Sequence, residues 1–205
     1  PPGILVWRSL LQWLGGIGVI VMAIAIFPML SVGGMQLFKT ENFEAPEKVI
    51  PRATSLARGI FIIYSVLTLI WATLLYFSGM YAFDAILHSM TTIATGGYST
   101  KTNSIGAFNS EIIDWVIIIG MIMGSLPFIH YLALTRGSFN ELIKDSQVQL
   151  FLGLLSSIII IIFCLLLFNN TYEWKDAIRY SAFNVTSILT GTGYGTADFG
   201  IWGGF

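Results

Sequence analysis

The sequence is short of charge and almost free of cysteine. Only 10% of its 205 residues are Asp, Glu, Lys or Arg, whereas soluble globular chains carry about 25%. The single cysteine, Cys164, excludes an intrachain disulfide and a cysteine-rich metal site. A net charge of −1 provides no basic surface for nucleic acid. These absences exclude a disulfide scaffold, and they argue against a nucleic-acid-binding protein and against a soluble globular chain.

Long hydrophobic runs take the place of the missing charge. Hydrophobic residues make up 55% of the chain, and each uncharged run exceeds the roughly 20 residues that a helix needs to cross a bilayer. A β-barrel would instead show alternating segments of roughly 10 residues. The sequence therefore predicts an all-α polytopic membrane protein. The uncharged runs are Ser9–Phe38, Gly59–Phe83, Trp115–Thr135 and Ser146–Tyr172.

The distribution of Lys and Arg predicts the orientation. Residues 39–58 carry four of them and residues 136–145 carry two, whereas residues 99–111 and 169–176 carry one each. Cytoplasmic loops are enriched in Lys and Arg. The first two links are therefore expected in the cytoplasm, and the other two on the outer side.

Two polar segments rich in threonine and glycine interrupt the apolar sequence. They read TTIATGGYST (91–100) and TSILTGTGYGTADFG (186–200), and their Gly-Tyr pairs lie 96 residues apart. Each follows a short segment that begins with Asp-Ala-Ile, at Asp84 and at Asp176. The pattern of span, short segment, Thr/Gly segment and span is complete in residues 59–135 and begins again at residue 149, which indicates an internal repeat.

The short segments are too short to cross a membrane. We expect residues 83–92 and 177–189 to be half-helices, with extended backbone at 93–98 and 189–194. The carboxylate at each start suits the positive end of the helix dipole, and the opposite end would favour a cation in the membrane centre. Glycines then allow backbone carbonyls to replace the water around an ion, as in potassium filters. The alternative is that both Thr/Gly segments are turns on the outer side.

These residues resemble a known family, the membrane subunit of the Trk potassium-uptake system in the Trk/Ktr/HKT superfamily. The resemblance implies four repeated helix–re-entrant pore loop–helix units around a pseudo-fourfold pore. It also implies that the chain is a piece of a longer protein, which cannot close a pore by itself. The stretches that carry it are WRSLLQWLGGIGVIVMAIAIFPMLSVGGMQL, FDAILHSMTTIATGGYST, SIGAF and GTGYGTADFGIW.

The resemblance assigns a part of the repeat to each region. Residues 1–38 match the closing transmembrane helix of a first repeat, and 59–135 match a complete second repeat. Residues 149–205 match a third repeat that is truncated after its filter. The two links, 39–58 and 136–148, are cytoplasmic in this arrangement.

The resemblance also assigns filter residues. Gly97 and Gly193 match the glycine that each filter strand shares. The positions whose carbonyls would bind potassium are Thr95, Gly96, Gly191 and Thr192. Third-repeat filters of the family more often read Thr-Thr-Gly-Phe, whereas this chain has Gly-Thr-Gly-Tyr at 191–194.

The function implied by the resemblance is potassium uptake across the bacterial cytoplasmic membrane. The implied partners are a cytosolic nucleotide-binding regulatory subunit and a second copy of the chain, and no cofactor is expected. Two other classes remain as alternatives. One is a secondary transporter with broken helices, which usually carries a charged residue deep inside a span.

The second alternative is an intramembrane enzyme that uses Ser89 or Ser125 with a histidine. His88 and Ser89 are adjacent and would diverge by about 100° on a helix. His130 follows Ser125 by five residues, a poor match to the i+4 spacing of helix neighbours. The sequence therefore predicts a conduit and not an enzyme.

Overall fold

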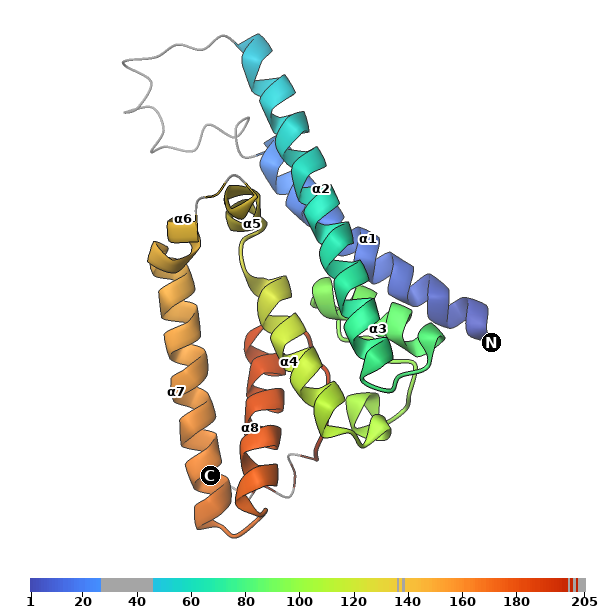
Figure 1. The fold of residues 1–205 in the computed structure, drawn as a ribbon, viewed down its shortest axis with the longest axis vertical. Coiled ribbons are helices and arrows are strands. Elements are labelled where there is room, and N and C mark those ends of the chain that lie inside the picture. Colours follow the sequence, from blue (N-terminus) through green and yellow to red (C-terminus); the bar gives the residue numbers. More distant parts are fainter. Residues whose placement is uncertain (27–45, 136, 138, 199, 201, 203–205) are drawn as a thin grey trace.

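The structure, a computed structural model, describes residues 1–26, 46–135, 137, 139–198, 200 and 202, and in these residues it is helical without strands (Figure 1). The α-helices are α1 (Pro2–Ile26), α2 (Pro46–Phe77), α3 (Ala82–Ile93), α4 (Glu111–Ser125), α5 (Phe128–Leu134), α6 (Phe139–Lys144), α7 (Ser146–Phe168) and α8 (Trp174–Leu189). The 3₁₀-helix η1 (Ser104–Phe108) lies between α3 and α4 in the chain.

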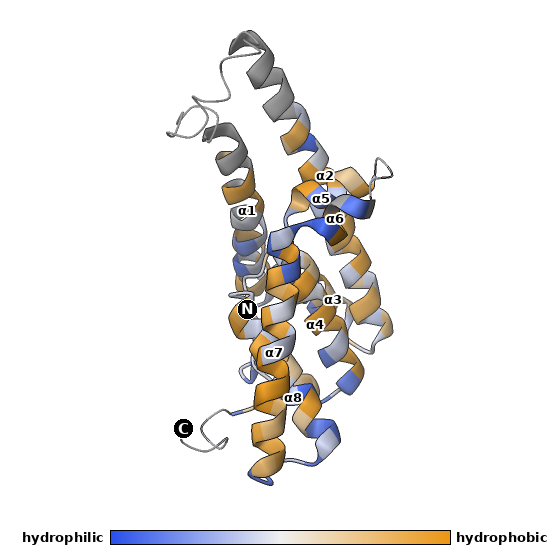
Figure 2. Ribbon diagram, turned by 90° about the vertical axis from the view of Figure 1, so that its left-hand side faces the viewer, coloured by the Kyte–Doolittle hydropathy of each residue, from blue (hydrophilic) through white to orange (hydrophobic). Residues whose placement is uncertain are grey.

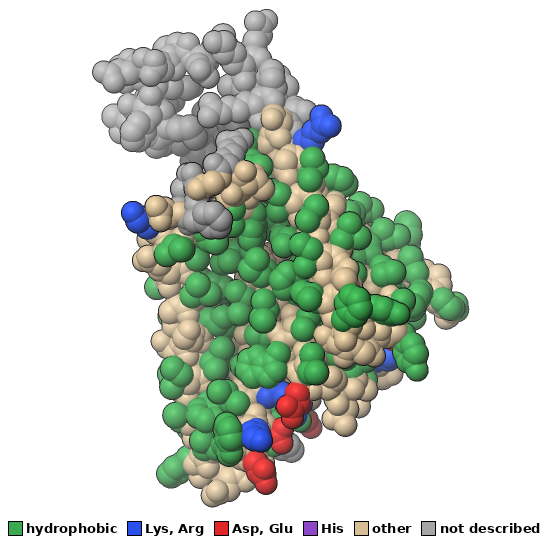
Figure 3. All heavy atoms as spheres, viewed as in Figure 1, with side chains coloured by type: hydrophobic (Ala, Val, Ile, Leu, Met, Phe, Trp, Pro, Cys, Tyr) green, Lys and Arg blue, Asp and Glu red, His purple; other side chains and the backbone are tan. Residues whose placement is uncertain are grey.

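Three of these helices are long and apolar enough to cross a membrane. Their apolar stretches are Pro2–Ile20, Ser55–Phe77 and Ser146–Phe168. Hydrophobic residues dominate α7 in Figure 2, and Figure 3 shows an apolar belt with charged side chains toward its two ends. Large apolar side chains such as Leu69 and Ile160 are more than half exposed, as expected where lipid is the solvent.

The uncharged run Trp115–Thr135 is broken at Pro127, where the sequence predicts a kink or the end of a helix. α4 stops at Ser125 and α5 starts at Phe128, with a bend of 93° between them. Pro127 lies in the break and caps the start of α5. Proline has no N–H to continue a helix, and it pushes the preceding residue toward extended backbone. Leu126 accordingly has ψ of 148°.

The link between α5 and α7 contains helix α6, which the sequence did not predict. Asp145 caps α7, because its Oδ1 accepts hydrogen bonds from the N–H groups of Val148 (3.0 Å) and Gln147 (2.8 Å). These bonds, of which the one from Val148 has the larger effect, together outweigh the effect of desolvation. They hold the pKa of the Asp145 carboxyl below its ordinary value. The cap explains why α7 begins at Ser146. Of the 39–58 link, residues 39–45 lie outside the described part.

The two short helices, α3 and α8, lie on opposite sides of α4. α3 contacts α1, α2 and α4, and α8 contacts α4 and α7. At 12 and 16 residues, they measure about 18 and 24 Å, less than the hydrocarbon thickness of about 30 Å. Their buried polar residues face protein. A core cluster joins α3, α4 and α8, and it includes Ala85, Ile117, Met121 and Phe183.

Candidate functional site: two return segments

α3 ends in a tight turn that sends the chain back, and we call residues 94–100 the first return segment. Thr95 N–H donates to Thr92 O (3.0 Å), and Gly96 N–H donates to Thr91 O (2.8 Å). These are the two bonds of a Schellman motif, which needs a left-handed residue at its centre. That residue is Thr95, with φ of +50°. A β-branched residue rarely adopts this conformation, so the position is strained.

α8 ends in a similar turn, followed by the second return segment (190–196). Here Gly191 takes the left-handed position, with φ of +72°. Two residues further on, Gly97 and Gly193 have φ of +67° and +86°. Positive φ thus alternates along both segments, which turns successive peptide groups toward one side. The sequence predicted extended backbone, and the left-handed residues that glycine makes accessible are the reason for the difference.

Hydrogen bonds hold the far end of each return segment against its own short helix. Thr91 Oγ1 donates to Tyr98 O (2.9 Å), and Ser187 Oγ donates to Tyr194 O (2.7 Å). Thr91 and Ser187 each lie six residues before the central glycine of their segment. The two segments are therefore anchored by the same chemistry at the same point.

A second pair of side chains anchors the residues that follow. His88 Nε2 lies 2.9 Å from Ser99 Oγ, and Asn184 Nδ2 donates to Thr196 Oγ1 at 3.2 Å. His88 and Asn184 are fully or almost fully buried and occupy equivalent positions, since they are 96 residues apart. Neither His88 nor Asn184 was predicted to anchor a return segment. A polar residue at matching places in two apolar half-helices was the signal for them.

The carbonyl groups between the two anchors are mostly left free. Five of these carbonyl oxygens accept no hydrogen bond from any of the described residues. Gly96 is different, because its oxygen accepts a hydrogen bond from Gln12 Nε2 on α1 (2.8 Å). Buried backbone carbonyls are nearly always paired, so the free carbonyl of Thr192, which is buried, is unusual and suits a cation, whereas Gly191 and Gly193 are exposed. The free carbonyls belong to Thr95, Gly97, Gly191, Thr192 and Gly193.

The two return segments meet at Gly97 and Thr192. A Cβ atom built on Gly97 would lie 1.8 Å from Thr192 O and 3.1 Å from the carbonyl carbon of Gly193. Only glycine allows this approach. The predicted site residues of the two segments are therefore brought side by side.

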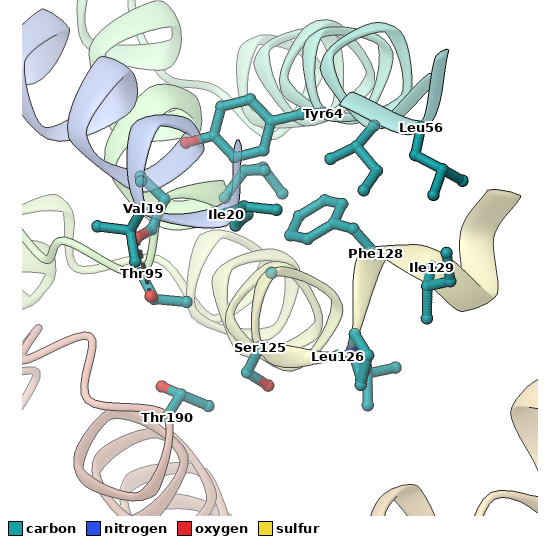
Figure 4. A pocket seen from close by; sticks show the side chains of 16 residues that line it. Val19, Ile20, Leu56, Tyr64, Thr95, Ser125, Leu126, Phe128, Ile129 and Thr190 are labelled. Atoms are coloured by element: carbon teal, nitrogen blue, oxygen red, sulfur yellow. Dashed lines mark hydrogen bonds between the residues drawn. The ribbon is translucent and has the colours of Figure 1, made fainter. Parts of the chain in front are cut away.

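A cavity of about 660 Å³ begins at the C-terminal ends of α3 and α8. Figure 4 shows Thr95 and Thr190 along one side of it, and Leu56 and Ile129 along the other. The negative ends of both helix dipoles meet its wall, since Ile93, Ala94 and Thr190 line it. Because the cavity is mainly apolar, the partial negative charge at that end comes from the C-terminal backbone carbonyls of α3 and α8.

Carboxylates lie at the opposite ends of the short helices, as the sequence predicted. Asp84 is in the first turn of α3 and pairs with Lys101 (3.0 Å). Asp176 is in the first turn of α8 and pairs with Arg179 (2.6 Å). Asp198, which follows the second segment, caps a local turn by accepting from Gly200 N–H (2.8 Å).

The serine and histidine pairs of an enzyme are not assembled. Ser89 Oγ donates to Ile86 O and Ser125 Oγ donates to Ile122 O, each at 2.8 Å within its own helix. His130 pairs with Asp145 (3.1 Å). His88 does contact a serine, but this is Ser99 of the first return segment. Within the described residues, no cluster of three or more His, Cys, Asp or Glu could hold a metal ion.

Comparison with known proteins agrees with this arrangement. The sequence model of the family described as "TrkH: Cation transport protein" matches residues 1–204. The chain belongs to the TrkH family of cation transport proteins. Membership in this family excludes the enzyme alternative.

Individual members of the TrkH family match almost the whole chain. The Trk system potassium uptake protein TrkI of Halomonas elongata is 40% identical over 98% of this chain and 41% of its own length. TrkH of Escherichia coli K12 is 38% identical over 98% of this chain and 43% of its own. The crystal structure of the potassium transporter TrkH from Vibrio parahaemolyticus is similar with a TM-score of 0.86, at 33% identity over 99% of this chain and 41% of that one.

The comparisons fix the fold class and the extent of the match. The chain is an all-α, multi-pass membrane protein, as the apolar runs predicted. It spans about two fifths of the length of the curated relatives that it matches.

Proposed function

We propose that these residues form part of a pore that conducts potassium across the cytoplasmic membrane of a bacterium. The observation that carries this proposal is the convergence of α3 and α8. Their C-terminal ends line one cavity, and from it two return segments lead away with adjacent free carbonyl groups. The names of the relatives, which are potassium uptake proteins, support the same ion.

The carbonyl oxygens of Thr95, Gly96, Gly191 and Thr192 are the proposed potassium ligands. A cation that loses its water needs several oxygens at fixed positions. Gly97 and Gly193 let the chain alternate its φ signs, so that these oxygens face one side. The Gly96 oxygen has a second lone pair, which it can offer to an ion while Gln12 occupies the first.

The rest of the proposed pore comes from the full-length protein. We expect two further return segments there, so that four strands surround one axis. The 39–58 and 136–148 links would face the cytoplasm and meet a nucleotide-binding regulatory subunit, and two copies of the protein would associate. This arrangement needs no cofactor.

A secondary transporter with broken helices is less well supported. The α4–α5 break is a feature that it would share. However, the α4–α5 break is flanked by buried apolar side chains, Leu126 and Phe128, and carries no polar anchor like those of the return segments among the described residues. The polar chemistry thus belongs to the segments that a filter would use.

The test is replacement of the two central glycines by serine in the full-length protein. Gly97→Ser adds a Cβ that collides with Thr192 O, so both segments must move. We expect the preference for rubidium over sodium to fall about tenfold, equivalent to about 1.4 kcal/mol of relative site affinity. Gly193→Ser should act in the same direction but less, because its added Cβ meets nothing within 4 Å and only its φ of +86° opposes it.

The matched control is Gly79→Ser. Gly79 also has positive φ (+101°) and open space for a Cβ, but it lies in the turn between α2 and α3. Rubidium and sodium uptake into liposomes is measured for all three variants, with the inserted protein quantified. Selectivity that is unchanged at both Gly97 and Gly193 would mean that the return segments are outer turns.

A further inference from the structure

Gln12 on α1 contacts the first return segment on both sides of its central glycine. Its Nε2 donates to Gly96 O (2.8 Å), and its Oε1 accepts from Tyr98 N–H (3.2 Å). One amide therefore replaces the hydrogen-bonding partner that a neighbouring strand would offer. Only one orientation of the amide satisfies both bonds, because the flipped group would place two donors and two acceptors together.

The contact depends on two glycines. A Cβ on Gly96 would lie 2.4 Å from Gln12 Oε1, so any other residue there would displace the amide. Gly16 follows Gln12 by one helical turn and faces the same side of α1. A Cβ on Gly16 would approach Ala94 Cβ to 3.3 Å. Gly16 thus brings α1 against the end of α3, which places Gln12 beside the return segment.

α1 is itself fixed to α2 at the neighbouring residue. Trp13 Nε1 donates to Thr68 Oγ1 (2.9 Å), and Tyr64 Oη donates to Trp13 O (3.0 Å). Tyr64 is fully buried and Thr68 is buried. The backbone that carries Gln12 is therefore held in place, and the amide can transmit that position to the return segment.

We propose that Gln12 is a positioning residue for ion selection, which fixes the direction of the carbonyl groups around Gly97. This inference rests on the proposed function. Without Gln12, the Gly96 carbonyl oxygen loses the one hydrogen bond that it accepts among the described residues, and the Tyr98 N–H loses its acceptor. Both peptide groups can then rotate, and the oxygens near Gly97 no longer keep the spacing that separates two ions of different size.

The test is Gln12→Met in the full-length protein, because methionine has a similar length and neither donates nor accepts strongly. The ratio of rubidium to sodium uptake should fall roughly three- to tenfold, the change that the loss of about one net hydrogen bond makes in an equilibrium. A merely structural role would lower the uptake of both ions equally. The matched control is Gln149→Met, since Gln149 Nε2 also donates to a carbonyl, Ile143 O (2.9 Å), but on exposed α7.

A second variant keeps the test decisive if Gln12→Met protein does not insert. Gly96→Ala should displace the amide and lower the uptake ratio by a similar factor. In a double-mutant cycle, Gln12→Ala with Gly96→Ala should be only slightly worse than Gln12→Ala alone, because both changes remove one contact and the added Cβ then meets only the Cβ of residue 12, at 3.1 Å. If Gly97→Ser lowers selectivity while the variants at Gln12 and Gly96 leave it unchanged, the role of Gln12 is wrong and the proposed pore stands. If all of these variants, Gly97→Ser included, keep the original ratio, the proposed pore fails as well.

Discussion

The two return segments follow similar courses but are held by different neighbours. The first is fixed from the side by α1, through the Gln12 amide and through Arg8, whose guanidinium lies 4.3 Å from the centre of the Tyr98 ring. The second is fixed from within, because Tyr194 is buried in the core between α3, α4 and α8. Gly195 N–H also bonds to Ser104 Oγ of η1 (3.1 Å).

The comparison distinguishes the contacts that both return segments share from those that differ between them. The elements common to both segments are the hydroxyl at Thr91 or Ser187, the polar side chain at His88 or Asn184, and a central glycine with positive φ. The outer support varies, and each segment takes it from whatever packs beside it. Replacements that distinguish common from variable supports test this comparison.

The largest expected effect is a difference in stability between variants of the ion pairs at the N-terminal ends of the two short helices, α3 and α8. Arg179 of α8 pairs with Asp114 of α4 (3.5 Å), and their side chains are 11% and 6% exposed. Arg179→Met would leave the Asp114 carboxylate buried without its cation, which costs about 3–5 kcal/mol. In the first unit, the Lys101 side chain is 41% exposed, so Lys101→Met should cost about 1 kcal/mol or less.

Unfolding of the purified full-length protein by denaturant measures both losses. Asp114→Leu combined with Arg179→Met is the control, because replacing both members of a buried pair by apolar residues is often neutral. Equal losses for Arg179→Met and Lys101→Met would mean that burial does not distinguish the two pairs.

An intermediate effect is expected at the two tyrosines. Thr92 Oγ1 donates to Tyr194 Oη (3.3 Å), Tyr194 Oη lies 2.5 Å from Thr91 Oγ1, and Thr91 Oγ1 donates to Tyr98 O (2.9 Å). If each hydroxyl donates once, the bonds form one chain from α3 through the second segment to the first. Such chains are strengthened cooperatively.

Tyr194→Phe interrupts this chain and should lower stability by about 1 kcal/mol, the typical net value of a hydrogen bond. Tyr98→Phe should change it by less, since that ring packs beneath Arg8. The midpoint of thermal unfolding, compared for the two variants in the same detergent, gives the difference. A larger loss from Tyr98→Phe would place the connection between the segments elsewhere.

Much of the fold could be predicted because long uncharged apolar runs indicate membrane-spanning helices. The half-helices α3 and α8 followed from their shortness and from Asp84 and Asp176. The break at α4–α5 was only partly foreseen, since Pro127 indicated an end or a kink but not the 93° bend. The bend depends on packing, with Tyr131 Oη donating to Met123 O across it (2.7 Å).

The site was predicted less completely than the fold. The repeated Gly-Tyr pairs pointed to Gly97 and Gly193, and both residues have positive φ. Gln12 was not predicted, because it lies 84 residues from Gly96 in the sequence. A long-range contact of this kind arises from the docking of α1 on α3, which no local pattern encodes.

The smallest expected effect concerns the residue that begins each return. Position 95 is threonine and position 191 is glycine, although both have positive φ, of +50° and +72°. A left-handed conformation costs a non-glycine residue about 1–2 kcal/mol. Thr95→Gly removes this strain but also the bond from Thr95 Oγ1 to Ala94 O. Because glycine also loses more backbone entropy on folding, by about 0.5–1 kcal/mol, the terms nearly cancel.

We therefore expect Thr95→Gly to change the free energy of unfolding by less than about 1 kcal/mol. Gly191→Thr should lower it by about 1 kcal/mol, since threonine takes on the strain and there is open space around Gly191 in which the side chain meets no obstacle. Denaturant unfolding of the two variants measures this asymmetry. If Thr95→Gly lowers the free energy of unfolding as much as Gly191→Thr does, the Thr95 side chain stabilises its turn by more than its strain costs. The first return segment would then depend on a threonine contact at the position where the second has glycine.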